Sequence, residues 1–471
     1  MGMIIGMSFP RNDKNLGLEP SILNVLPRGS NVEYCYDNHD FDDSAVEMYL
    51  CSVYISGMAE FKKWAMRHDT RKIVVGGYHP TMFPEAFLNY ADKIVIGPTD
   101  DIYATLKRKS TPFRLSRYDA SKIGNDRFVG GHLISGDEWT DYTNNLVPLE
   151  SVVENRIFEG ALTFSNLPRY DLYDIGRNQQ IIPGKKPDDL VTSVNTSFGC
   201  PFKCDFCCTP VMFGPRLISK PLEALSREVD FMKAHLIHSA LLSPASVLRD
   251  RYVFVRDENF TLQNDFEERL RIIARLDAKI YMFGSANTLT KKVMDKLKEY
   301  GVYMICIGLE DPTKTYAKNK TLDKVVAGLK DRGIYTYLSF IVNPLEVVGA
   351  VKATAFYKAL KERVYHLMPE MICGNFLMPF PGTPIWDDYY HLISEDDFKE
   401  YDSKTPFLIK NRVVHDKMRY YMFKFQWDYF MSSKYDQQVR DFEVEDTLHL
   451  RFLELKRYFD EVYRSIAIVR P

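Results

Sequence analysis

Short apolar runs alternate with amphipathic segments along most of the chain. Between residues 1 and 115, each run is bounded by Gly, Pro, Asn or Asp, as buried parallel strands tend to be. These runs are Met3–Ser8, Val32–Tyr36, Tyr49–Ile55, Lys72–Val75 and Lys93–Ile96. Amphipathic segments such as Met58–Arg67 lie between them. This order predicts an α/β domain with a doubly wound, Rossmann-like sheet and any ligand at the carboxyl ends of its strands.

Residues 116–190 are less regular, and we interpret them as a linker. The alternation resumes at residue 191 and continues to residue 386. Strands are predicted at Val191–Thr196, Tyr252–Val255, Ile280–Phe283, Tyr303–Ile307, Tyr335–Ile341 and Met371–Met378. Between them, apolar periodicity predicts a helix over Leu289–Tyr300, with Gly301 as its C-cap. Six strand–helix repeats predict a partial (β/α)6 barrel, in which chemistry gathers at the C-terminal ends of the strands.

Residues 387–471 are predicted to form a helical C-terminal region. Two groups of apolar residues recur there at helical spacing. The first is Leu448, Phe452, Leu455, Phe459 and Val462, and the second is Met418, Tyr421, Met422 and Phe425. Such stripes are usually core. We therefore expect two helices that pack on the barrel, with a wall facing a substrate as the alternative.

The composition is that of an ordinary globular protein, with 45% hydrophobic and 26% charged residues, which excludes a disordered chain. Lys and Arg number 61 against 63 Asp and Glu, a net charge of −2, so the basic excess of a nucleic-acid binder is missing. No apolar run approaches the ~18–20 residues that span a bilayer, and no basic flank precedes the apolar N-terminus. We expect a cytoplasmic protein with no nucleic-acid or membrane partner.

The eight cysteines are too few for a disulfide scaffold, but four of them, Cys200, Cys204, Cys207 and Cys208, fall within nine residues. The spacing C-x3-C-x2-C supplies three thiolates for an iron–sulfur cube and leaves one iron open, as a catalytic centre requires. The adjacent Cys208 is a poor fourth ligand because neighbouring cysteines rarely reach one cluster. A zinc knuckle is the alternative, but no His or Cys pair lies nearby to complete a tetrahedral site.

This cysteine motif, with Phe206 before its last cysteine, resembles that of the radical S-adenosylmethionine (radical SAM) superfamily. Further segments are similar to superfamily signatures at the ends of later strands. They are the acidic segment 254–260, the Gly-x-Glu of 308–310 and the Pro-Gly-Thr-Pro of 381–384. The N-terminal region, with its Gly76–Pro80 turn, resembles the cobalamin-binding domain that precedes many such barrels.

The resemblance implies a [4Fe-4S] cluster on Cys200, Cys204 and Cys207, with S-adenosylmethionine on its open iron near Phe206. It further implies that Asp257 or Glu258 accepts from the methionine ammonium in a charged hydrogen bond. It implies that Glu310 and Asn287 lie near the ribose, and that an electron donor such as flavodoxin or ferredoxin is a partner. Taken singly, each of these polar residues is more often a solvated surface group.

The resemblance to cobalamin domains is incomplete. Those that bind cobalt through histidine carry Asp-x-His-x-x-Gly after the first strand. Here Asp37-Asn38-His39 follows the second predicted strand, and Asp42 stands in place of the glycine. Relatives without that histidine also bind cobalamin. The sequence favours a vestigial domain over one that keeps the cofactor, since a fold does not carry its ligand with it.

Two further cysteines, Cys306 and Cys373, lie in predicted barrel strands. Alternation puts Cys373 and Asn375 on one face, with Ile372 and Phe376 toward the outer helices, so Cys373 should point into the barrel. A thiol there can return a hydrogen atom to a carbon radical. The alternative for either cysteine is an inert buried thiol.

Proteusin-type radical SAM peptide epimerases share the cobalamin-like region, the length class and a late donor cysteine with this chain. The resemblance implies inversion of L- to D-residues in a ribosomally made precursor peptide with a leader segment, and Cys373 as the donor. Cys208 is a weaker candidate. A cobalamin-dependent radical SAM methyltransferase is the second interpretation, and an iron–sulfur sensor without turnover is the third.

Overall fold

The structure is a computed structural model that describes residues 2–9, 21–29, 31–35, 40–107, 127–129, 132–135, 138–140, 146–148, 157–160, 162–172, 190–234 and 251–435. The chain divides into two compact units. The first comprises Met1–Asp174, Gly199–Arg216 and Pro379–Lys399, and the second comprises Ile175–Phe198, Leu217–Met378 and Glu400–Pro471. Within the described part of the chain, no helix has the length and apolar character needed to cross a membrane.

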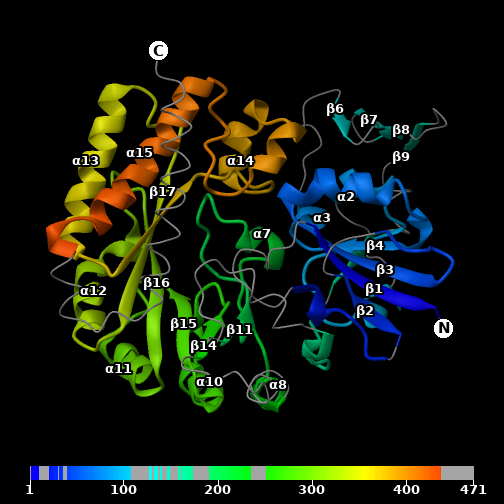
Figure 1. Ribbon diagram of the computed structural model, residues 1–471, viewed down its shortest axis with the longest axis horizontal. Helices are drawn as coiled ribbons and strands as arrows, with labels where there is room; N and C mark the ends of the chain where they lie inside the picture. Colours follow the sequence, from blue (N-terminus) through cyan, green and yellow to red (C-terminus); the bar gives the residue numbers. More distant parts are fainter. Residues whose placement is uncertain are drawn as a thin grey trace. The chain divides into compact units, whose positions relative to one another are not determined.

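The first unit is built on a six-stranded parallel sheet with the order β10-β5-β4-β3-β1-β2 (Figure 1). Its strands are β1 (Met3–Phe9), β2 (Val32–Tyr34), β3 (Val46–Val53), β4 (Ile73–Gly76), β5 (Lys93–Ile96) and β10 (Ile157–Glu159). The apolar runs predict the first five, within a few residues at each end. The doubly wound, Rossmann-like domain is therefore confirmed.

Strand β10 comes from the region interpreted as a linker. It pairs in parallel with β5, with Phe158 opposite Val95. Four short strands from the same region, β6 (Arg127–Val129), β7 (His132–Ser135), β8 (Glu138–Thr140) and β9 (Leu146–Pro148), form a separate antiparallel sheet. Three-residue strands give too short a period-2 pattern to be recognised in a sequence.

The helices of the first unit are α2 (Met58–Ala65), α3 (Tyr78–Met82), α4 (Ile102–Lys107), α7 (Thr209–Phe213) and α14 (Pro384–Tyr389). Helix α2 packs its apolar face on the sheet: Phe61 and Trp64 lie with ring centroids 5.4 and 5.5 Å from that of Phe9. All three side chains are buried, so this aromatic cluster is part of the core of the domain.

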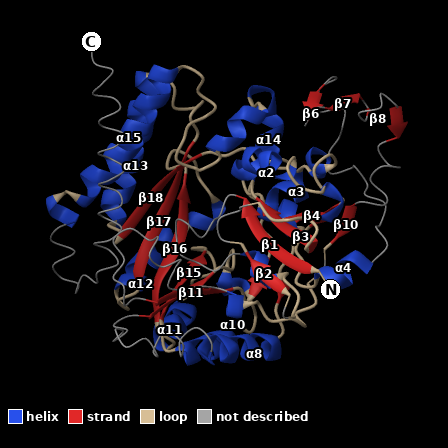
Figure 2. Ribbon diagram, turned by 45° about the vertical axis from the view of Figure 1, so that its right-hand side comes forward, coloured by secondary structure: helices blue, strands red, loops and turns tan. Residues whose placement is uncertain are grey.

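The second unit contains the other six-stranded parallel sheet, in the order β11-β14-β15-β16-β17-β18 (Figure 2). Its strands are β11 (Leu190–Val194), β14 (Arg251–Val255), β15 (Lys279–Gly284), β16 (Val302–Glu310), β17 (Tyr335–Val342) and β18 (Met371–Phe376). A short ribbon of β12 (Ser197–Phe198) and β13 (Ile218–Ser219) follows the first strand. The spatial order of the six strands equals their order in the chain, which confirms the partial barrel.

Helices α8 (Leu222–Met232), α10 (Phe266–Ile273), α11 (Lys291–Glu299), α12 (Leu322–Lys330), α13 (Ala350–Leu367) and α15 (Arg412–Phe430) belong to this unit. Gly301 follows α11 with φ +80°, the left-handed C-cap that the sequence predicts. Helices α13 and α15 lie side by side in both views, and Tyr365 and Tyr429 pack edge to face between them at 5.4 Å (Figures 1 and 2).

The predicted stripe on the C-terminal helix is partly wrong. Met418 and Met422 are buried, but Tyr421 is 51% exposed. The buried face of α15 instead includes Gln426, whose Oε1 accepts from the Gly374 N–H at 3.1 Å. A polar residue can hold this position because β18 offers it a hydrogen bond, which hydrophobic periodicity cannot reveal. The stripe from Leu448 to Val462 lies outside the described residues.

Candidate functional site

The cysteine motif lies on a loop between β12 and α7. Cys200, Cys204 and Cys207 are half-buried thiols in no disulfide. The Cys207 N–H donates to the Cys204 carbonyl at 3.1 Å, so a turn holds these two residues close. No three Cys, His, Asp or Glu side chains converge on a single-metal site among the described residues. Three thiolates on one short loop suit a cluster instead, because each binds a different iron.

Cys208 has a distinct place. It is the N-cap of α7, and its carbonyl accepts from the Val211 and Met212 N–H groups at 3.0 Å. Gly199 begins the loop with φ +85°, where a Cβ would lie 2.4 Å from the Arg216 carbonyl oxygen. Only glycine fits this position, so the backbone fixes both ends of the loop.

The Pro-Gly-Thr-Pro segment supports the same loop. The Ile385 N–H donates to the Asp205 carbonyl at 3.2 Å, within the cysteine motif. A Cβ on Gly382 would lie 2.9 Å from Val211 of α7. Thr383 caps α14 by accepting from the Trp386 N–H at 3.3 Å. This segment therefore packs on the cysteine loop and on the helix that follows it.

In the second unit, Asp257 follows β14 and is completely buried. Its carboxylate accepts from the Thr196 N–H at 2.6 Å, from the Ser197 hydroxyl at 2.6 Å and from the Gln263 amide at 3.0 Å. Burial raises the pKa of Asp257, while the hydrogen bonds from Ser197 and Thr196 oppose that shift. Asp257 thus joins the ends of β14 and β11, and its oxygens are occupied by the chain itself.

Glu258, the neighbouring acid, is half-buried, and Asn287 is exposed just beyond β15. The Ser285 hydroxyl donates to Asn287 Oδ1 at 2.7 Å, which leaves the Asn287 amide hydrogens for another partner. Both side chains lie after the carboxyl ends of neighbouring strands, where the sequence places them. Phe206, in the first unit, is half-buried on the cysteine loop.

Glu310 ends β16 in the left-handed conformation, with φ +62°, and is 6% exposed. Its carboxylate folds back over Gly308, where a Cβ would lie 2.0 Å from Glu310 Oε1. Lys318 forms an ion pair with it. The glycine of the Gly-x-Glu signature therefore makes room for the carboxylate two residues later.

Cys373 lies on β18 with its Cα paired to that of Ser339 on β17. Asn375 shares its face and donates to the Ser339 hydroxyl at 3.0 Å. The opposite face packs outward, since a Cβ on Gly374 would lie 3.0 Å from Met422 of α15. Cys373 therefore faces the inner side of the partial barrel, and the residue is 8% exposed.

Aromatic residues and a second thiol line the same interior. Tyr281 stacks on Phe254 with 4.7 Å between ring centroids, and it hydrogen-bonds to the Cys306 thiol. Burial, with the neighbouring Cys373 adding to it, raises the pKa of the Cys306 thiol, so that this thiol stays protonated. Cys306 on β16 is paired with Tyr337 on β17, and Cys373 on β18 is paired with Ser339 of the same β17.

Sequence reasoning missed Lys404. Its Nζ lies 3.1 Å from Cys373 Sγ, although 31 positions separate the residues. No motif marks this lysine, and it lies on a segment after the last barrel strand, outside the predicted barrel. Only the fold of the C-terminal region brings it to the thiol.

Known proteins resemble this arrangement. The sequence model of the radical SAM superfamily matches residues 194–343, from the end of β11 to the end of β17. This segment is a radical SAM domain. The match supports a [4Fe-4S] cluster and S-adenosylmethionine as cofactors.

Several similar proteins are methyltransferases. Bacteriochlorophyllide d C-8(2)-methyltransferase of Chlorobaculum tepidum is 20% identical over 76% of this chain and 73% of its own. The bacteriochlorophyllide d C-12(1)-methyltransferase of the same organism is 22% identical over 84% of this chain and 70% of its own length. The solved methyltransferase TsrM of Kitasatospora setae, with cobalamin and a [4Fe-4S] cluster bound, shares the fold at a TM-score of 0.51 and 16% identity, over 82% and 77% of the two chains. These relatives support a radical SAM enzyme with a cobalamin-binding-like N-terminal domain, and not the finer resemblance to peptide epimerases.

The N-terminal motifs have structural partners of their own. Gly77, with φ +101°, packs on β3, where a Cβ would lie 3.1 Å from the Ser52 hydroxyl. His79 is 1% exposed among the rings of Phe87 and Phe398. Burial lowers the pKa of His79 to about 3, so its ring is neutral. The Gly76–Pro80 turn thus serves the domain core.

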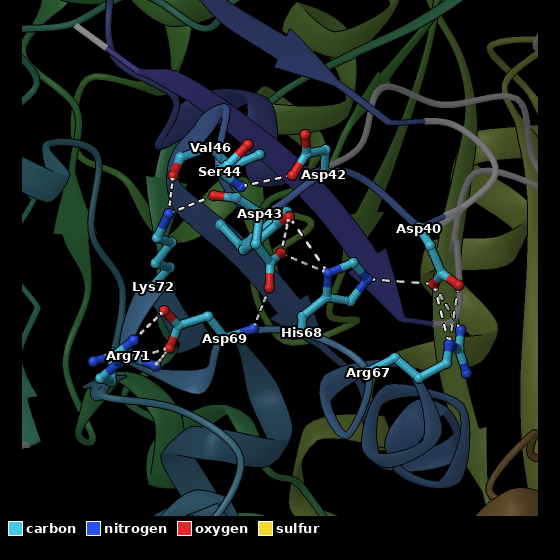
Figure 3. Close-up of polar contacts among 11 residues, drawn as sticks. Asp40, Asp42, Asp43, Ser44, Val46, Arg67, His68, Asp69, Arg71 and Lys72 are labelled. Atoms are coloured by element: carbon cyan, nitrogen blue, oxygen red, sulfur yellow. Dashed lines mark hydrogen bonds and ion pairs between the residues drawn. The ribbon is translucent and has the colours of Figure 1, made fainter.

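The acidic segment near the Asp-x-His sequence is also fastened to the domain (Figure 3). Asp42, in place of a glycine, accepts from the Ser44 N–H at 2.9 Å. Asp43 contacts His68 Nδ1 at 2.8 Å, and Asp40 pairs with Arg67 at 2.8 Å. His39 itself lies outside the described residues. The described carboxylates of this segment are therefore engaged by the end of α2 and by neighbouring backbone.

Proposed function

We propose that this chain is a radical SAM peptide epimerase that inverts L-residues of a ribosomally made precursor peptide, with Cys373 as the hydrogen-atom donor. When bound, the cluster and S-adenosylmethionine supply the adenosyl radical that removes an α-hydrogen. Cys200, Cys204 and Cys207 hold the cluster. An electron donor such as flavodoxin or ferredoxin, and a peptide with a leader segment, are the proposed partners.

The observation that carries this proposal is the position of Cys373. Its thiol faces the interior of the partial barrel from the middle of β18, the last strand of the sheet. A thiol has a hydrogen that it can give to a carbon radical, and a donor on the face opposite to abstraction returns that hydrogen with inverted configuration. Methyl transfer from cobalamin requires no return of a hydrogen atom to the substrate carbon.

The strand-end polar groups have distinct roles in this proposal. Glu258 takes the methionine ammonium, because the oxygens of Asp257 are already occupied by Thr196, Ser197 and Gln263. Glu310 and the Asn287 amide serve the ribose. Each contact uses a donor or acceptor suited to a charged or hydroxylic partner.

The test is Cys373→Ala, with Cys306→Ala as its matched control. The Cys373 variant should keep its cluster and still form 5′-deoxyadenosine, but D-residues should fall to trace levels. In deuterated water the wild type should gain one deuterium at each inverted α-carbon, because thiol hydrogens exchange with solvent. Normal inversion by Cys373→Ala would refute the assignment of Cys373 as donor. If both variants invert L-residues normally, the epimerase proposal itself is refuted.

Cobalamin-dependent methyl transfer is the second candidate, and the similar proteins favour it over inversion. Two matched relatives are named methyltransferases, and each is covered over 70% or more of its length. The shared fold of TsrM, solved with cobalamin, further supports cobalamin at the N-terminal sheet.

Anaerobic purification and added cobalamin separate the two candidates. An epimerase with a vestigial domain should be fully active with iron, sulfide and S-adenosylmethionine alone, and should bind no corrinoid. Stoichiometric corrinoid bound with micromolar affinity, about 8 kcal/mol, together with S-adenosylhomocysteine as a product, would establish methyl transfer and refute inversion.

A further inference from the structure

Lys404 uses all three of its ammonium hydrogens around Cys373. Its Nζ lies 3.1 Å from Cys373 Sγ, 2.7 Å from the Gly374 carbonyl oxygen and 2.8 Å from Asn375 Oδ1. An ammonium has three donors, so these three acceptors fix its orientation. None of the three is a carboxylate. The positive charge is thus directed at a sulfur atom that can itself become negative.

The turn that carries Lys404 is built to hold it there. Ser403 has φ +61°, a left-handed conformation that is costly for a residue other than glycine. Its carbonyl accepts from the Phe376 N–H at 2.8 Å. The Asp402 carboxylate accepts from the N–H groups of Lys404 and Thr405 at 2.7 and 2.8 Å. Such strain persists where the surrounding contacts over-determine it, which makes Lys404 a fixed neighbour of the thiol.

We propose that Lys404 is the positioning residue that restores the Cys373 thiol after each hydrogen-atom transfer. This inference rests on the proposed function. In the transfer, the Cys373 S–H bond breaks and a C–H bond forms on the substrate, which leaves a thiyl radical. An external one-electron donor, of the class that reduces iron–sulfur proteins, reduces the thiyl to a thiolate. The Lys404 ammonium stabilises this thiolate and then gives it a proton, and the resulting amine takes a proton from water.

The other titratable groups around Cys373 do not compete for this role. Burial raises the pKa of the Tyr281 hydroxyl on β15 and of the Cys306 thiol on β16. Both therefore stay neutral near pH 7. Glu310, which also lies toward this interior, is paired with Lys318. Lys404 is thus the cation whose contact with the Cys373 sulfur the structure shows.

The first readout does not depend on turnover. In the holoenzyme, iodoacetamide labels thiolates, and peptide mass spectrometry reports the labelled fraction of Cys373 at each pH. In Lys404→Gln, which removes the charge and keeps an amide donor, the labelling curve should move to higher pH by about 1–3 units, as for loss of a close opposite charge. Lys404→Arg should restore the wild-type curve. An unchanged curve in Lys404→Gln would overturn the proposal, and Lys404→Met repeats the test should the Gln variant not fold.

The second readout is the rate of repeated inversion. In Lys404→Gln the steady-state rate should fall by about 100-fold, the usual loss of a proton donor, while the first inversion per enzyme is affected far less. If the first inversion and the steady-state rate fall by the same factor, Lys404 has only a structural role and the proposal fails. If Cys373→Ala abolishes inversion and Lys404→Gln turns over normally, this inference fails and the proposed function stands. If the labelling curve shifts in an enzyme that never inverts a residue, the pairing stands and the proposed function fails.

Discussion

Thr196 gives both its backbone N–H and its hydroxyl to the carboxylate of Asp257, 61 positions later in the chain, at 2.6 and 2.5 Å. The contact joins the end of β11, four residues before the first cysteine of the motif, to the end of β14. The next residue, Glu258, is only half-buried. Two adjacent acids of one signature therefore differ in burial, and Asp257 joins the ends of two strands.

Substitutions at these two positions should affect different quantities, the stability of the fold and the affinity for S-adenosylmethionine. Asp257→Asn places an amide against several donors and should lower the free energy of unfolding by about 1–3 kcal/mol, the cost of unsatisfied buried groups. Glu258→Gln should leave that free energy unchanged and weaken S-adenosylmethionine binding. Urea denaturation and equilibrium dialysis measure the two quantities. Weaker binding in a fully stable Asp257→Asn would show that Asp257, and not Glu258, receives the ammonium.

Replacing Cys200, Cys204 or Cys207 by Ala removes one of the three proposed protein ligands of the cluster. Each variant should lose the iron–sulfur charge-transfer absorption and all cleavage of S-adenosylmethionine. Cys208→Ala is the matched control and should keep both, because Cys208 contributes its backbone to the start of α7. Retention of the absorption in any of the first three variants would remove that cysteine from the ligand set.

Gly308→Ala should act through Glu310. The new Cβ would stand 2.0 Å from Glu310 Oε1, so the carboxylate must leave its place over the strand. S-adenosylmethionine affinity should fall about 10–100-fold, as for loss of a charged hydrogen bond, and Glu310→Gln should match it. Gly301→Ala strains the backbone where no atom lies within 4 Å, and should reduce stability without changing affinity. Undiminished affinity in Gly308→Ala would exclude Glu310 from the site.

The Asp43–His68 contact predicts an acid-sensitive first domain (Figure 3). Burial opposes ionisation of Asp43, but hydrogen bonds from Tyr49, His68 and the Asp69 N–H outweigh it and lower its pKa below the ordinary 3.8. A carboxyl whose folded-state pKa is lowered contributes stability above its ordinary value and loses it as pH falls through the folded value. Asp43→Asn should therefore cost stability at pH 7 and little at pH 3. Urea denaturation at both pH values measures this, with the exposed Glu47→Gln as control; equal losses at both would exclude the ionic contribution.

The sequence by itself determines the layout of this protein. Apolar runs such as Lys93–Ile96 and Tyr335–Ile341 locate the strands, because a strand covered on both faces is largely apolar. The cysteine spacing predicts that the cysteine loop holds a cluster, since three thiolates within eight residues need no distant partner. Alternation along β18 likewise gives the face on which Cys373 lies, because successive side chains of a strand point to opposite sides.

Tertiary structure decides how deeply each acid is buried and what surrounds each thiol. Asp257 and Glu258 are indistinguishable in the sequence, and only the folded chain brings Thr196 and Ser197 to the carboxylate of Asp257. Lys404 reaches Cys373 across 31 positions through a left-handed turn at Ser403, a conformation that no local preference of serine favours. Hydrophobic periodicity predicts which face of one element is buried. It cannot predict a hydrogen bond or a charge that another element supplies, because those contacts exist only once the chain has folded.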